Sequence, residues 1–252
     1  MLSLIRVLFL CLLGAPHSSF ADEPVRVAVA ANVRPAFERL ETLFEASRGI
    51  AIEATFGASG KFAAQIMSGA PFDIFLSADS EFPEKLHASG FGAAPPRVYA
   101  LGTLVLWTMT DIDLSTGMDV LLSEQVRKVA IGNPKVSPYG RASIEVFEKL
   151  GMASAVNEKL VYGESLAQVM QFVEAQAAEL GLTARSLVLA PELRAKGHWQ
   201  AIPRGLADPI PQSTLQLRPR EGVQPEAVQQ FFEFLFSPAA QAILLESGYE
   251  LP

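Results

Sequence analysis

The strongest constraint on this chain is the regular alternation of short apolar segments with longer amphipathic ones. Residues 25–31 are short and apolar, as expected of a strand that a parallel sheet buries on both faces. They lead into a segment in which apolar residues recur with helical spacing, at Val33, Phe37, Leu40 and Phe44. Because such strand–helix units recur, the sequence predicts an α/β protein with doubly wound, parallel sheets.

The same reading extends along the whole chain. The expected strands are 25–31, 50–56, 74–78, 128–132, 160–163, 180–189 and 214–217. Expected helices follow Ala31, with Pro35 in the first turn and Gly49 as the stop, and follow Ser59, ending at Gly69. Further helices are expected at 80–89, 139–150, 165–177, 225–236 and 238–247.

Two stretches are suited to connecting separate domains. Residues 99–109 are apolar and long enough to pass from one domain to another, and 203–211 hold three prolines and predict a linker. We therefore expect two α/β lobes joined by two crossover segments. The predicted organisation is a signal peptide at 1–21, the first part of lobe 1 at 22–102, lobe 2 at 103–212 and the return to lobe 1 at 213–252.

The N-terminus has the pattern of a secretory signal. Residues 7–13 are apolar, Arg6 is the only charge before them, and small residues precede the predicted cleavage after Ala21. Cys11, the only cysteine, lies in this segment, so the mature protein would contain no thiol. No later apolar run reaches the length of about 18 residues that a membrane-spanning helix needs. The sequence predicts an exported, periplasmic protein without direct membrane insertion.

Charge limits the class of partner. The net charge is −7 at pH 7 and no run rich in Lys or Arg is present, which argues against nucleic acid. An acidic surface does not attract anions over long range. An anionic ligand would therefore have to be bound by local groups.

Five predicted turns carry chemistry at the point where a strand meets a helix. They are Ala30-Ala31-Asn32, 57–60, Ser77-Ala78-Asp79, 137–140 and 163–166. Ligands in open α/β sheets bind beyond the carboxyl ends of the strands, and helix N-termini bind anions through unpaired N–H groups. Taken singly, a polar residue at such a turn is an ordinary helix cap or core side chain. Their occurrence together favours a cage of neutral donors, among them Asn32, Ser59 and Tyr139.

Other chemistries are less well supported. The segment 57–61 is followed by Phe62, at the position where a phosphate-binding loop requires Ser or Thr. After cleavage only His87 and His198 remain, so a zinc site lacks ligands. Ser165 lies in a Gly-x-Ser-x-Ala sequence, which misses the last glycine of a nucleophile elbow. We expect no enzyme activity and no cofactor, although an exported enzyme on this scaffold stays an alternative.

The chain resembles the periplasmic molybdate-binding proteins of ABC importers, which belong to the type II periplasmic binding proteins. The resemblance is carried in order by VAVAANVRPAF (27–37), FGASGKFAAQI (56–66), GAPFDIFLSAD (69–79), GNPKVSPYGRA (132–142) and GESLAQVMQFV (163–173). It implies two lobes with the ligand cleft between them. It also implies an oxyanion ligand, molybdate or tungstate, delivered by a monomer to the membrane subunits of an importer.

The resemblance further implies a set of ligand-binding residues. These are Asn32, where many members have serine, the Ser59 hydroxyl, the backbone N–H groups of Ala78 and Leu166, and Tyr139. Some members place a ligand-binding tyrosine where this chain has Ala184, and Tyr139 could supply that hydroxyl instead. No residue would bind the metal atom directly. Sulfate or another oxyanion remains the alternative ligand, and discrimination would then depend on the size of the cavity.

Overall fold

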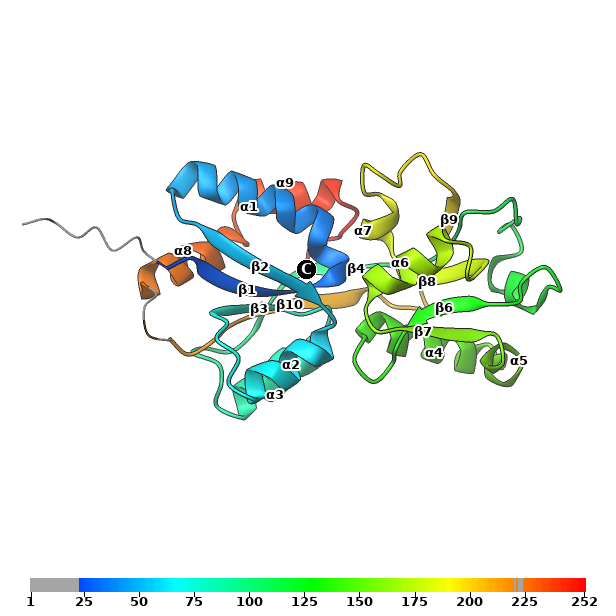
Figure 1. Cartoon of the computed structure of the whole chain (residues 1–252), viewed down its shortest axis with the longest axis horizontal. Coiled ribbons are helices and arrows are strands. Elements are labelled where there is room, and N and C mark those ends of the chain that lie inside the picture. Colours follow the sequence, from blue (N-terminus) through cyan, green and yellow to red (C-terminus); the bar gives the residue numbers. More distant parts are fainter. Residues whose placement is uncertain (1–22, 220, 222–223) are drawn as a thin grey trace, which may run out of the picture.

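The computed structural model describes residues 23–219, 221 and 224–252, so the predicted signal peptide lies outside the described residues. The described chain forms two α/β lobes that lie side by side (Figure 1). Each lobe is built around one five-stranded sheet. Within the described ranges, no helix combines the length and apolar character needed to cross a membrane.

The sheet of lobe 1 has the strand order β2-β1-β3-β10-β4. Its strands are β1 (Val25–Ala30), β2 (Ile52–Gly57), β3 (Ile74–Leu76), β4 (Arg97–Gly102) and β10 (Ile210–Gln216). On one face lie α1 (Arg34–Arg48), α8 (Pro225–Phe234) and α9 (Pro238–Glu246). The short 3-10 helix η1 (Ala31–Val33) precedes α1, and the return strand β10 precedes α8 and α9. On the other face lie α2 (Ser59–Met67) and α3 (Glu81–Ala88).

The sheet of lobe 2 has the strand order β7-β6-β8-β5-β9. Its strands are β5 (Leu104–Thr108), β6 (Val129–Gly132), β7 (Leu160–Gly163), β8 (Leu180–Ala184) and β9 (His198–Ala201). The 3-10 helix η2 (Gly117–Leu122) precedes β6. The helices α4 (Pro138–Lys149) and α5 (Ala153–Asn157) lie on one face, and α6 (Leu166–Glu174) and α7 (Arg185–Val188) lie on the other (Figure 1).

Alternation of side chains along β1 explains why helices cover both faces. Val27 and Val29 belong to the larger apolar core, which includes Phe37 and Leu40 of α1. Ala28 points to the opposite face and packs in a second cluster with residues of α2 and α3. Successive side chains of a strand point to opposite faces, so a strand that is apolar on both faces from Val27 to Ala30 must be covered twice.

Both sheets are mixed, whereas the sequence predicted parallel sheets. β1 is parallel to β2 and β3, and β6 is parallel to β7 and β8. The crossover strands differ: β10 is antiparallel to β3 and β4, and β5 is antiparallel to β8 and β9. A strand that enters a lobe from its neighbour arrives at the edge facing that neighbour. It must therefore run against the strands that end there.

The return strand begins earlier than predicted. β10 pairs with β4 from Ile210, so the predicted boundary between residues 212 and 213 falls inside a strand of lobe 1. Pro211 is part of this strand although the sequence predicted a linker there. The strand predicted at 180–189 is also too long, because it ends at Ala184 and residues 185–188 form a helical turn. A short apolar run cannot be assigned to strand or buried helix by periodicity alone.

Candidate functional site

A small cavity lies where the two lobes meet. It is lined by residues from all five predicted turns: Ala30, Ala31, Asn32, Gly57, Ala58, Ser59, Ala78, Ser137, Pro138, Tyr139 and Leu166. The free space among them is about 10 Å³, so the lobes are closely apposed around it. None of the lining residues carries a charged side chain.

Three helices begin at this cavity. Ser59 is the first residue of α2, Tyr139 is the second of α4 and Leu166 is the first of α6. The first N–H groups of a helix have no partner inside it. Within the described chain, the backbone N–H groups of Asn32, Ser59, Tyr139 and Leu166 have no backbone acceptor. Together with the positive ends of the helix dipoles, they form a site suited to an anion.

Ser59 and Ala78 contact each other directly. The Ala78 N–H donates to the Ser59 Oγ at 3.0 Å, and both residues are buried. The serine hydroxyl acts as the acceptor in this bond, which leaves its proton for another partner. The Ala78 N–H is thus engaged within the protein, and its predicted role as a donor to the ligand stays a prediction.

Tyr139 is 1% exposed, yet its hydroxyl has no hydrogen-bond partner among the described residues. Burial raises the pKa of Tyr139 well above its usual value, so the hydroxyl remains a protonated donor. The ring reaches the end of β4, where a Cβ atom on Gly102 would lie 2.1 Å from the hydroxyl oxygen. Only glycine leaves room there. Ala184, which stands where some relatives were expected to have tyrosine, is fully buried at the end of β8.

Asn32 is held by three residues that the sequence analysis did not identify. Its Nδ2 donates to the Gln212 Oε1 at 2.7 Å and to the Tyr249 Oη at 3.0 Å. Its carbonyl oxygen accepts hydrogen bonds from the hydroxyls of Tyr249, at 2.9 Å, and Ser186, at 2.8 Å. All four residues are buried. No motif marks the three partners, because they lie more than 150 positions away in the sequence.

Charged residues surround the cavity without lining it. Arg141 of α4 pairs with Asp79 and, at 3.2 Å, with Glu81, while Lys61 of α2 pairs with Glu164 at 2.6 Å. Both sets of ion pairs join one lobe to the other. Burial raises the pKa of Asp79, against the lowering effects of hydrogen bonds and of Arg141. Each of these two cations thus has an acidic partner.

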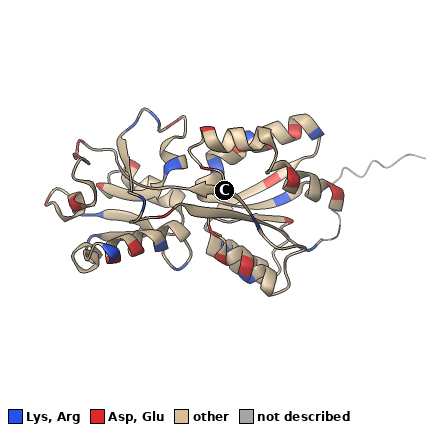
Figure 2. Ribbon diagram, turned by 180° about the vertical axis from the view of Figure 1, so that it is seen from behind, with Lys and Arg blue, Asp and Glu red and all other residues tan. Residues whose placement is uncertain are grey.

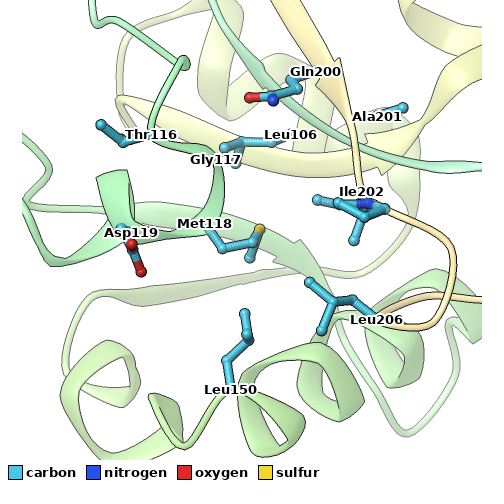
Figure 3. A pocket seen from close by; sticks show the side chains of 11 residues that line it. Leu106, Thr116, Gly117, Met118, Asp119, Leu150, Gln200, Ala201, Ile202 and Leu206 are labelled. Carbon is cyan, nitrogen blue, oxygen red and sulfur yellow. The ribbon is translucent and has the colours of Figure 1, made fainter.

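Elsewhere, charged residues of both signs are spread over the outer helices and loops of the two lobes (Figure 2). A larger pocket of about 250 Å³ lies in lobe 2, between β5, β9 and η2 (Figure 3). It is lined mostly by apolar side chains such as Leu106, Met118, Leu150 and Ile202. No group of three or more potential metal ligands occurs in the part of the chain that the structure describes.

Known proteins resemble this chain over almost its whole length. The family model "Bacterial extracellular solute-binding protein" matches residues 25–250. The molybdate-binding protein ModA of Azotobacter vinelandii is 38% identical over 228 residues, which cover 90% of this chain and 90% of the relative. The ModA of Rhodobacter capsulatus is 37% identical over 227 residues, with 89% and 87% covered.

A solved structure agrees with these relatives. The periplasmic molybdate-binding protein of Azotobacter vinelandii superposes with a TM-score of 0.83 at 32% identity, covering 90% of this chain and 99% of the other. The resemblance seen in the sequence motifs and the predicted two-lobed α/β fold are therefore confirmed. This chain belongs to the bacterial extracellular solute-binding proteins.

Proposed function

We propose that this protein binds molybdate, and tungstate as well, in the cavity between the lobes. The observation that carries the proposal is the meeting of five strand-to-helix turns, from both lobes, around a cavity without a charged side chain. The relatives that are named for molybdate binding extend over nine-tenths of the chain. The predicted site residues Asn32, Ser59, Ala78, Tyr139 and Leu166 all line this cavity.

Neutral donors can hold a dianion tightly if enough of them converge. The backbone N–H groups of Asn32, Ser59, Tyr139 and Leu166 and the hydroxyls of Ser59 and Tyr139 supply six hydrogen bonds. At about 1.5–3 kcal/mol each, they contribute roughly 9–18 kcal/mol before desolvation is subtracted. A nanomolar dissociation constant corresponds to about 12 kcal/mol. The donor set is therefore of the right size.

The surroundings of the donors favour an oxyanion without a proton. A cavity with few acceptors offers little to the proton that phosphate keeps at neutral pH. Sulfate carries the same charge as molybdate but is smaller, so donors spaced for the larger ion would contact it incompletely. Because the free space among the lining residues is only about 10 Å³, entry of a tetrahedral oxyanion requires the lobes to separate, and closure then removes the ligand from water.

The wider role follows from this binding. We propose that the protein is exported, captures the oxyanion outside the cytoplasm as a monomer, and passes it to the membrane subunits of an ABC importer. No catalytic step and no cofactor are part of this proposal. An exported enzyme would need an activated nucleophile or an acid–base pair at the cavity. The lining hydroxyls of Ser59, Ser137 and Tyr139 have no carboxylate, imidazole, thiol or amine among the lining side chains to act as their base.

Isothermal titration of the purified protein tests the ligand. We expect one molybdate or tungstate to bind per chain, sulfate to bind at least about 100-fold more weakly, and phosphate to give no heat. Sulfate binding as tight as molybdate binding would instead support the alternative, a sulfate-binding protein. Gel filtration with light scattering, with and without molybdate, tests the monomer.

A further inference from the structure

The side-chain nitrogen and the backbone carbonyl oxygen of Asn32 are both hydrogen-bonded to distant parts of the protein. Gln212 lies on the crossover strand β10, Tyr249 lies after the last helix, and Ser186 lies on α7 of lobe 2. Between them they make four hydrogen bonds of 2.7–3.0 Å with this one residue. Asn32 is 1% exposed, Gln212 is fully buried and Tyr249 is 3% exposed.

The direction of these bonds is determined by Gln212. Its Nε2 donates to the carbonyl oxygens of Ile210 at 2.9 Å and Ala78 at 3.4 Å. Carbonyl oxygens only accept, so the amide nitrogen of Gln212 must face them and its oxygen must face Asn32. The nitrogen of Asn32 must in turn face Gln212, since two amide oxygens cannot bond each other. The amide orientation of both side chains therefore follows from fixed backbone groups.

The orientation leaves Asn32 with one donor for a ligand. Both N–H groups of its Nδ2 are used, the first by Gln212 and the second by Tyr249. Its backbone N–H, at the start of η1, has no backbone acceptor in the described chain. The turn at residues 30–32 lines the cavity. The two hydroxyls bonded to the Asn32 carbonyl oxygen hold the next peptide plane, between Asn32 and Val33, and so restrict rotation of the Asn32 backbone.

We infer that Gln212 and Tyr249 are positioning residues for the oxyanion. They bind the side-chain nitrogen of Asn32, so that the ligand meets the backbone N–H of Asn32 and not its side-chain amide. The inference rests on the proposed function, because it concerns the same cavity. It goes beyond the expectation drawn from the family resemblance, which named Asn32 as a ligand donor, because it assigns the donation to the backbone N–H and names the residues that orient it.

The Tyr249→Phe variant tests this assignment because it removes only the hydroxyl oxygen. That oxygen accepts from the Asn32 Nδ2 and donates to the Asn32 carbonyl. We expect the molybdate dissociation constant to rise about tenfold, mainly through faster release. If the side-chain amide of Asn32 bound the ligand directly, the Nδ2–H released from Tyr249 could donate to the ligand. The affinity for molybdate would then stay the same or increase. Unchanged or tighter binding would therefore overturn the inference.

Tyr99→Phe is the matched control. Tyr99 is 1% exposed and its hydroxyl has no hydrogen-bond partner among the described residues. We expect its molybdate affinity to equal that of the wild type. A tenfold loss of molybdate affinity in this variant too would mean that any change among the buried tyrosines weakens binding. That result would contradict a specific role of Tyr249.

A spectroscopic readout separates positioning from a general loss of packing. In wild-type protein labelled with ¹⁵N, the backbone amide signal of Asn32 should shift on saturation with molybdate. In Tyr249→Phe, saturated at higher concentration, that shift should be clearly smaller, while the shift of the Leu166 amide is kept. An Asn32 shift equal to that of the wild type would contradict the inference.

The failure of the inference differs from failure of the proposed function. If wild-type protein does not bind molybdate, the proposed function is wrong. If it binds and Tyr249→Phe binds equally well, only the positioning role is wrong. Should Tyr249→Phe not fold, as judged by circular dichroism, Gln212→Met gives a second test with the same expectations, since it removes the other partner of the Asn32 amide.

Discussion

Tyr139 shows how much a single residue at this cavity depends on its surroundings. Its side chain is buried between the lobes, and its hydroxyl has no hydrogen-bond partner in the described chain. An unpaired buried hydroxyl costs about 1–3 kcal/mol. Such a cost is explained when the group serves a ligand, because the bound anion then supplies the missing acceptor.

The Tyr139→Phe variant is expected to separate stability from binding. The ligand-free protein should unfold at the same temperature as the wild type or slightly higher, since an unpaired polar group is removed. The molybdate dissociation constant should rise about tenfold, through the loss of one hydrogen bond to a charged group. Thermal unfolding with and without molybdate measures both effects. A lowered melting temperature without ligand would show that the hydroxyl has a structural partner.

The protonation states at the cavity predict how binding depends on pH. No lining side chain ionises near neutrality, and burial raises the pKa of Tyr139 further from it. The molybdate dissociation constant should therefore stay constant between about pH 6.5 and pH 9. On the acid side, Asp79 protonates at a higher pH than a free aspartate does, because burial raises its pKa. Titrations across this range check the prediction, and a transition near pH 7–8 would contradict it.

At the scale of elements, α2 is placed unusually close to the opposite lobe. The Gly60 N–H donates to the Val136 carbonyl of lobe 2 at 2.9 Å. A Cβ atom at Gly60 would lie 2.8 Å from the Val136 Cα and 2.8 Å from the Phe82 ring. The N-terminus of α2 can therefore reach the cavity only because its second residue has no side chain.

Gly60→Ala should accordingly oppose closure while leaving lobe 1 folded. Alanine favours helices more than glycine does, so the helix itself should not suffer. The added methyl group would push α2 away from the loop before α4, and we expect molybdate affinity to fall at least about tenfold. Ala64→Ser, at an exposed position of the same helix, is the control and should bind as the wild type does. Equal affinity of the two variants would show that the lobes need not approach this closely.

At the scale of the whole molecule, ion pairs join the lobes on two sides of the cavity. Lys61 and Glu164 form a pair that is about half exposed on both sides, and such pairs contribute little. The pairing of Arg141 with Asp79 is more buried, with side-chain exposures of 30% and 10%. We therefore expect the second contact to contribute more to the closed arrangement.

Asp79→Asn distinguishes closure from simple charge effects by the sign of its result. Removing a carboxylate beside a site for a dianion would, by charge alone, strengthen binding. If the carboxylate acts by pairing with Arg141 across the lobes, binding should weaken about five- to tenfold, and dissociation should accelerate. Stopped-flow dissociation and titration at low and high salt measure this. Asp113→Asn, an exposed acid of lobe 2, is the control, and tighter binding by Asp79→Asn would contradict the role in closure.

The elements themselves could largely be predicted from the sequence. The pattern of Val33, Phe37, Leu40 and Phe44 predicts α1, and all four side chains are fully buried. Gly49 ends that helix with φ of 67°. These features are local: helical periodicity and the left-handed conformation that glycine tolerates depend only on neighbouring residues. The alternation of strands and helices likewise indicates where turns and helix N-termini occur, and so where candidate donors are.

The direction of the crossover strands and the partners of the candidate residues were decided only by the tertiary structure. β10 begins at Ile210 and runs antiparallel because it enters lobe 1 from lobe 2. Gln212, Tyr249 and Ser186 reach Asn32 from distant parts of the chain. Sequence by itself determined which backbone turns could bind an anion, since helix N-termini are a local property. Which donors are used within the protein depends on contacts between distant segments, and these exist only once the two lobes have folded and met.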